Sequence, residues 1–197
     1  MPQEGVIRAA FMIGPGVNVI DTAGPWEVFQ DAAVMTGGSP PFEQYTIAET
    51  IDPVEASAGL TILPDYAYAA APQPHVVVVP AQQSSTATLG WLRRVARRTD
   101  VVMSVCTGAY VLAEAGLLDG RMATTHHGSF DDFESSFPKV ELVRGPRFVE
   151  HDHIATAGGL TSGIDLALRV VERYLGRPAA AGTARYMEHE SSRWRSA

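Results

Sequence analysis

The chain has 197 residues and a formal net charge of −7; 46% of its residues are hydrophobic and 19% are charged. This length suits one domain with a full core, and the composition is that of a globular protein, which excludes a disordered one. An acidic surface repels phosphate backbones, so we expect no nucleic-acid partner. The arginines at positions 93, 94, 97 and 98 have the spacing of a solvated helix face.

The cysteine count and the apolar pattern exclude further classes. The single cysteine, Cys106, cannot form an internal disulfide, and no Cys/His set has zinc spacing. The N-terminus carries an acidic residue where a secretory signal has basic ones, and Arg8 interrupts its apolar run. No apolar stretch reaches bilayer length. We therefore expect a soluble, cytoplasmic protein with no membrane contact and no metal.

The first part of the chain predicts three strands, a helix and a hairpin. We expect strands over 5–13 and 42–49, and a hairpin over 54–69, where polar and apolar residues alternate around a central glycine. A helix is expected to start near Pro25, because proline suits the first helical turn. The β-branched run HVVVVP at 75–80 is typical of a central parallel strand that is buried on both faces.

The rest of the chain alternates strands with helices. Strands are expected over 101–106 and 121–127, and a hairpin over 140–159. Five helices are expected, over 86–100, 107–118, 130–137, 161–176 and from Pro178 to about His189. The second of them should end at Asp119-Gly120, and the fourth should be capped by Thr161 or Ser162. This alternation predicts βαβ units, hence a mostly parallel sheet between two helix layers in a single domain over 1–197.

The only thiol stands where a predicted strand meets a predicted helix. In open α/β sheets ligands bind at the carboxyl ends of the strands, so Cys106 is expected at that crevice. Ser104 and Gly108 are the small neighbours that a nucleophile elbow needs. A helix N-terminus favours an anion and predicts a thiol pKa below the ordinary value. The alternative is a small buried hydrophobic residue, the commonest role of a lone cysteine.

Other polar residues have two interpretations from the residues alone. Asp21 suits a turn or a helix cap. His126, which ends the strand expected over 121–127, is either a satisfied surface histidine or a pocket residue. The histidines at 151 and 153 share a strand face without a third ligand, which favours a hairpin tip over a metal site. Asp165 is expected to cap its helix and to interact with the helix dipole.

Three segments in order, VIDTAGPWEVF, SVCTGAYVLAEAGLLDGRMATTHH and AGGLTSGIDLAL, resemble the ThiJ/PfpI family of the class I glutamine amidotransferase-like superfamily. The resemblance covers nearly the whole chain and is strongest to isonitrile hydratases and to the N-terminal domains of AraC-type regulators. It implies a flavodoxin-like sandwich that assembles as a homodimer.

The resemblance also assigns site residues. It makes Cys106 the nucleophile, Asp21 the acidic residue that approaches it, and Thr107 the residue whose N–H and hydroxyl face the site. It puts His126 near the pocket. The family's Pro-Gly-Gly is replaced here by Pro80, Ala81 and Gln82, so an oxyanion-binding N–H remains while bulk is added and any glycine-only backbone angle would be strained.

Isonitrile hydration is the activity that the resemblance implies best, with a small-molecule substrate and no cofactor. Amidotransferases pair the cysteine with a late histidine and glutamate, and only His189-Glu190 stands late here, without the usual proline between them. PfpI-type proteases have histidine where this chain has Thr107, and glyoxalase-like members have glutamate in place of Asp21. The competing expectation is a domain that senses small molecules or oxidants; the regulators continue into a helix-turn-helix region, which this sequence lacks.

Overall fold

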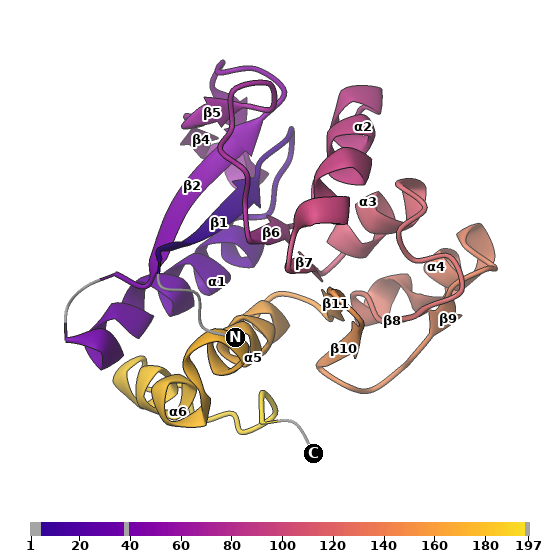
Figure 1. The fold of residues 1–197 in the computed structure, drawn as a ribbon. Coiled ribbons are helices and arrows are strands. Elements are labelled where there is room, and N and C mark those ends of the chain that lie inside the picture. The colour runs from indigo at the N-terminus through magenta and orange to yellow at the C-terminus, as the bar shows by residue number, and fades with distance from the viewer. Residues whose placement is uncertain (1–4, 38–39, 196–197) are drawn as a thin grey trace.

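A mostly parallel sheet of seven strands runs through the middle of the computed structural model (Figure 1). The structure describes residues 5–37 and 40–195; positions 1–4, 38–39 and 196–197 of the expected domain lie outside the described residues. In spatial order the strands are β10 (Phe148–His151), β11 (Ile154–Ala157), β7 (Val101–Val105), β6 (Val76–Val79), β1 (Ile7–Met12), β2 (Phe42–Ala48) and β5 (Tyr66–Ala67). Within this sheet the β10–β11 pair is antiparallel and the other pairs are parallel.

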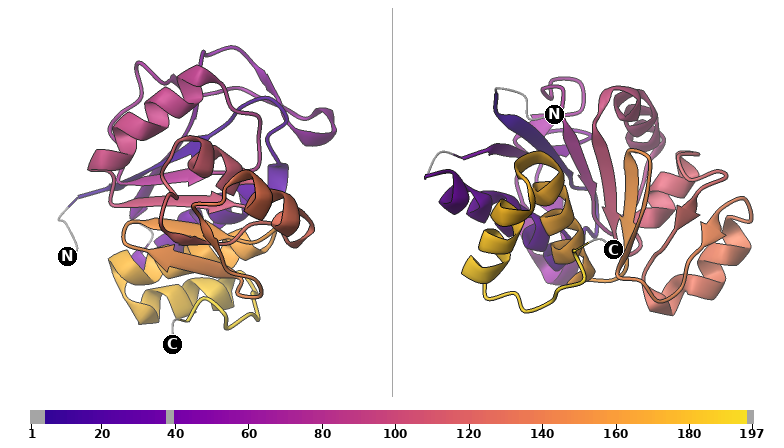
Figure 2. Two further views of the ribbon diagram at one scale, coloured as in Figure 1. Left: turned by 90° about the vertical axis from the view of Figure 1, so that its right-hand side faces the viewer. Right: turned by 60° about the horizontal axis from the view of Figure 1, so that its bottom comes forward.

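Two helix layers cover the sheet, as the alternating pattern predicted. One face packs against α1 (Val19–Asp31), α5 (Ser162–Leu175) and α6 (Arg177–Tyr186), and the other against α2 (Thr86–Val95), α3 (Gly108–Glu114) and α4 (Phe130–Ser136). The right-hand view in Figure 2 shows the strands between these layers. Along β6, Val76 and Val78 enter one core and Val77 and Val79 the other, because successive side chains of a strand point to opposite faces. The flavodoxin-like α/β fold is confirmed.

Two small sheets lie outside the central one. The predicted hairpin over 54–69 contains β3 (Val54–Glu55) paired antiparallel with β4 (Thr61–Ile62). The strand expected over 121–127 is much shorter, since only β8 (Met122–Ala123) pairs, in parallel, with β9 (Glu141–Leu142). Beyond it the backbone leaves the ladder, since the N–H of Thr124 donates to the side-chain Oγ1 of Thr156 in β11 at 2.8 Å and not to a backbone carbonyl.

The first helix begins earlier than expected. Its first residue is Val19, and the Asn18 side chain caps it by accepting a hydrogen bond from the N–H of Asp21. The expectation of a start near Pro25 was wrong, since Pro25 lies inside the helix. The asparagine cap decided the start, and it places Asp21 in the first helical turn.

Two further helices end earlier than expected. The helix after Cys106 ends at Glu114 and not near Asp119, because Gly116 takes a left-handed φ of 73° that stops it. The last helix ends at Tyr186, so His189 lies beyond it. None of the helices in residues 5–37 and 40–195 combines the length and apolar character that crossing a bilayer requires.

Candidate functional site

Cys106 occupies a sharp turn between β7 and α3, as predicted for an elbow. Its φ is +59°, a left-handed value that a residue with a Cβ rarely adopts. Hydrogen bonds from the N–H of Cys106 hold the turn: the acceptors are the carbonyl oxygens of Ala157, at 3.2 Å, and of Gly158, at 3.0 Å. The residue is 8% exposed, so the thiol sits just below the surface. Strained backbone of this kind persists where the surrounding structure imposes it, and it concentrates at functional sites.

The elbow depends on a glycine two residues after the cysteine. A Cβ at Gly108 would lie 2.1 Å from the carbonyl oxygen of Val79 and 2.8 Å from that of Pro80. No side chain fits there, because backbone atoms cannot give way. Ser104, the small residue on the other side, is fully buried. The two small neighbours therefore serve the close packing that the sequence predicted.

Asp21 reaches the cysteine from the first turn of α1. Its side chain is fully buried, and Oδ2 accepts a hydrogen bond from the N–H of Ala81 at 3.2 Å. The Cys106 thiol and the N–H of Leu160 also lie close enough to lower the carboxyl pKa. Burial outweighs all three contacts and raises the pKa of Asp21 to about 6. Oδ1 is buried without a hydrogen-bond partner among the described residues.

The pKa of Cys106 is raised, contrary to the expectation from the helix N-terminus. Burial is the largest cause, and the negative charge of Asp21 adds to it. The N–H groups of Thr107 and Leu160 and the Thr107 hydroxyl act in the opposite direction but do not compensate. The helix that follows spans only the seven residues Gly108–Glu114. The site thus holds a protonated thiol beside a carboxylate that can accept its proton.

Leu160 was not predicted from the sequence. It precedes α5 with a φ of +52°, and its N–H is directed at both Asp21 and Cys106. Together with Thr107 it gives the site two backbone donors that can stabilise negative charge. A backbone N–H leaves no trace in residue type, so the only available signal was the Gly158-Gly159 pair just before it.

Ala81 and Gln82 do not strain the loop that follows β6. Neither residue has a positive φ, so no glycine-only angle is present at these positions for the substitution to strain. The N–H of Ala81 is used to hold Asp21, and its carbonyl accepts from the N–H of Asn18 at 2.8 Å. The Gln82 amide lies against Gly14, and within the described chain its buried oxygen and nitrogen have no hydrogen-bond partner.

His126 lies beside the site, next to the loop that carries Leu160. Its Nδ1 accepts from the N–H of Gly128 at 3.1 Å, and its ring packs so tightly on Gly159 that a Cβ there would lie 2.2 Å from it. Together with Arg147 and Leu160 it lines a cavity of about 290 Å³. The structure therefore places His126 at a pocket next to the loop that carries Leu160.

Asp165 has a different environment from the cap that was expected. It lies in the first turn of α5 but is fully buried, with Arg147 on Oδ2. His189 and Ser191 contact Oδ1 at 3.2 Å and 2.7 Å. His189, the histidine that was weighed as part of an amidotransferase pair, therefore contacts Asp165. The prediction missed these partners because they lie 18 to 26 residues away in sequence.

The histidines at 151 and 153 flank a turn, in agreement with a hairpin tip. Asp152 between them has a φ of +57°, and the segment connects β10 to β11. Within residues 5–37 and 40–195 no three His, Cys, Asp or Glu side chains are grouped so that they could hold a metal ion.

The fold and the site define an α/β sandwich protein with a buried cysteine at a strand–helix elbow. Residues 7–173 match the model of the DJ-1/PfpI family, and the chain belongs to this family. It is 30% identical to the isonitrile hydratase of Pseudomonas putida over 176 residues, which are 86% of this chain and 73% of that protein.

Regulators and solved structures are also similar. The chain is 34% identical over 129 residues to the HTH-type transcriptional regulator CdhR of Pseudomonas aeruginosa, covering 63% of this chain but only 38% of the regulator. A THiJ/PfpI family protein from Pseudomonas syringae superposes with a TM-score of 0.83 at 26% identity over 95% of this chain and 77% of that one. Drosophila melanogaster DJ-1beta has a TM-score of 0.78 at 18% identity, over 95% of this chain and 100% of its own.

Proposed function

We propose that this protein is an isonitrile hydratase-like enzyme, a cofactor-independent hydro-lyase in which Cys106 is the nucleophile. The observation that carries the proposal is the pairing of the Cys106 thiol with the buried Asp21 carboxyl in a strand–helix elbow. A carboxyl whose pKa is raised to about 6 is a better proton acceptor than an ordinary aspartate and still ionises near neutral pH. The similarity to isonitrile hydratase supports the choice of substrate.

The first half of the reaction forms a covalent intermediate. The thiol proton of Cys106 moves to Asp21 as sulfur bonds to the isonitrile carbon, and Asp21 then delivers a proton to that same carbon. The product is a thioimidate in which the carbon carries one hydrogen and the sulfur. The N–H groups of Thr107 and Leu160 stabilise the negative charge that develops near sulfur.

Water completes the cycle. Asp21, ionised again, takes a proton from a water that attacks the thioimidate carbon, and its unpartnered Oδ1 is the atom available for that water. Asp21 passes that proton to the nitrogen of the adduct, and as the C–S bond breaks the hydroxyl proton leaves the new carbonyl and returns through Asp21 to sulfur, which releases the N-substituted formamide. Across the cycle, one isonitrile and one water are consumed and one N-substituted formamide is formed. In this scheme His126, Gly108, Ala81 and Gln82 shape the pocket, and no metal or organic cofactor takes part.

The same proposal includes the setting of the enzyme. We place residues 1–197 in one domain that forms a homodimer, as its family resemblance implies. The single free cysteine supports a reducing cytoplasmic location, and the net charge of −7 argues against a nucleic-acid partner.

A second function has specific support. Several relatives are transcriptional regulators, and Gln82 places a buried, unpartnered amide in the loop that carries Ala81. These observations favour a non-catalytic domain that senses a small molecule or an oxidant through the same pocket.

A turnover screen separates the two functions. Purified protein is incubated with small aliphatic and aromatic isonitriles, and the formamide is measured by NMR. The enzyme proposal expects catalytic turnover that Cys106→Ala abolishes, and a thioimidate adduct on Cys106 visible by mass spectrometry after acid quench. Cys106→Ser keeps the size and tests the thiol itself; it should also be inactive. Absence of turnover by the intact protein with every isonitrile would reject the hydratase and leave the sensor.

A further inference from the structure

A second cavity lies away from Cys106. It has a volume of about 500 Å³ and is bounded by the loop after β1, the connection from β2 to β3, and the start of α2. Neither Cys106 nor Asp21, Thr107 or Leu160 lines it. Its size is within the range of small-molecule sites, which extends from about 300 to 1,000 Å³.

The floor of this cavity is apolar. Ile13 and Ala48 are 0% and 3% exposed, and both lie at the carboxyl ends of central strands. The Tyr68 ring forms one wall and stacks on Trp91 with a centroid distance of 5.2 Å, while its hydroxyl lies 3.3 Å from Thr88 Oγ1. These contacts hold a preformed aromatic surface in place. An apolar body with few rotatable bonds fits such a floor.

The rim of the cavity carries one sign of charge. Glu49, Asp52 and Glu55 line it, and no lysine, arginine or histidine is among its described lining residues. None of the three carboxylates forms an ion pair within the described residues. Glu49 accepts a hydrogen bond from Ser85 Oγ at 2.7 Å, and its charge contributes to raising the pKa of Tyr68. A concave surface lined by one sign of charge concentrates ligands of the opposite sign.

A metal ion does not fit this rim. Calcium needs six to eight oxygen ligands converging on one point. Within residues 5–37 and 40–195 no three acidic or histidine side chains are close enough together to hold an ion. The carboxylates are spread around an opening whose floor is hydrophobic, so the complementary ligand has both a cationic group and an apolar body.

We propose that this cavity is a binding site for a small organic cation, an ammonium group attached to an apolar body. The ammonium pairs with Asp52 and Glu55 at the rim, where its charge also interacts with Glu49, and the apolar body packs on Tyr68, Ile13 and Ala48. The proposal does not depend on isonitrile turnover, since it uses none of the residues around Cys106.

Three matched probes test the charge requirement. They are 2-phenylethylammonium, the neutral 2-phenylethanol and the anionic phenylacetate, each titrated into the protein by calorimetry at low salt. We expect saturable one-to-one binding of the ammonium, at least about tenfold tighter than that of either other probe, and weakening with added salt. Trp91 fluorescence should change on binding, because Trp91 stacks on the cavity wall. Absence of saturable ammonium binding, or equal binding of phenylacetate, overturns the proposal.

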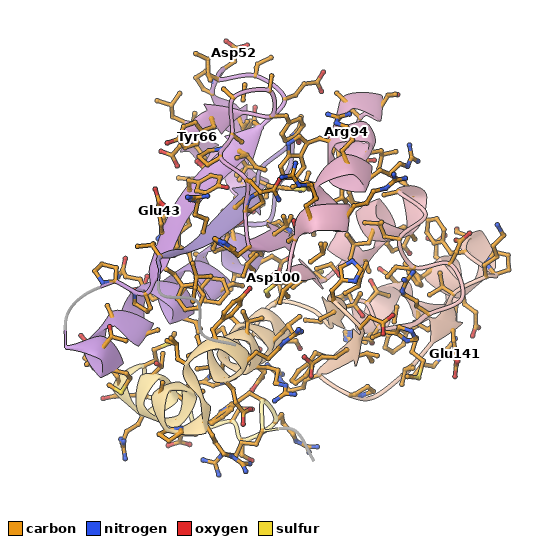
Figure 3. The ribbon with its side chains drawn as sticks, viewed as in Figure 1. Glu43, Asp52, Tyr66, Arg94, Asp100 and Glu141 are labelled. Carbon is orange, nitrogen blue, oxygen red and sulfur yellow. The ribbon has the colours of Figure 1, made fainter. Side chains whose placement is uncertain are left out.

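Variants locate the site. The double variant Asp52→Asn, Glu55→Gln should weaken ammonium binding by about tenfold or more, since it removes two of the three rim charges. Both side chains are exposed, so circular dichroism should show an unchanged fold. Glu141→Gln is the matched control, an exposed carboxylate that lies on the other side of the molecule from Asp52 (Figure 3). If the control weakens binding as much per charge removed as the double variant does, the effect is one of net charge and the site is wrong.

Discussion

Two aspartates in this protein are fully buried, and their surroundings differ. Asp165 is surrounded by partners, because Arg147 contacts one of its oxygens and His189 and Ser191 contact the other. Among the residues that the structure describes, Asp21 has no cationic partner; it accepts the N–H of Ala81 on Oδ2, has no hydrogen-bond partner on Oδ1 and faces a thiol. A buried charge that is paired and hydrogen-bonded contributes to structure, whereas one that is left incomplete costs stability and is retained for another purpose.

The Asp21 region combines a shifted pKa with strained backbone. Burial raises the pKa of Asp21 to about 6, which makes it a group that exchanges protons near neutral pH. The strained φ of +59° at Cys106 lies beside it. Asp165 instead joins α5 to the β9–β10 connection and to the segment after α6. We infer that the Asp21 region is arranged for chemistry and the Asp165 region for stability.

The largest expected effect concerns catalysis. Asp21→Asn keeps the size of the side chain but cannot shuttle a proton, so turnover should fall by about a hundred- to ten-thousand-fold. Asp165→Asn should change the rate by less than about tenfold, since it touches none of the reacting groups. Formamide release under saturating isonitrile measures both. Survival of activity in Asp21→Asn would mean that Asp21 has only a structural role and would remove the contrast.

The second effect is a pH dependence of stability. Asp21 has a folded-state pKa raised from 3.8 to about 6, so the stability present below pH 4 is lost as pH rises through about 6. Two units correspond to at most about 3 kcal/mol. Asp21→Asn should therefore equal the natural protein in unfolding free energy near pH 4 and exceed it at pH 7. Urea unfolding across this range measures it. Parallel curves for the two proteins would contradict the raised pKa.

The smallest effect concerns Asp165. Asp165→Asn leaves the Arg147 guanidinium without its carboxylate, and losing one partner of a buried pair costs about 3–5 kcal/mol. Since the Arg147 side chain is 32% exposed, we expect a smaller loss of about 2 kcal/mol. Thermal and urea unfolding at pH 7 provide the measurement, with Asp131→Asn, an exposed aspartate bonded to Arg144, as the matched control. Equal losses in the two variants would mean that burial does not distinguish them.

The sequence by itself determined the framework of this protein. The continuous β-branched run at 75–80 is typical of a strand in the middle of a covered sheet, and it identified β6. The order of small residues around Cys106 predicted the elbow, because backbone packs so closely on Gly108 that no side chain fits. These features are local, and residue type alone is sufficient to specify them.

Only the tertiary structure decided which way the pKa values of Asp21 and Cys106 are shifted. Because Asn18 caps α1, the helix begins at Val19 and not near Pro25, and Asp21 lies in its first turn. The pKa of Cys106 is raised because burial and the facing carboxylate outweigh the short α3, and neither quantity can be read from residues 101–114. Leu160 acts through a backbone N–H, and Asp165 is paired by residues that are distant in sequence. Desolvation and long-range contacts depend on the assembled chain, and they decide the charge state of buried groups.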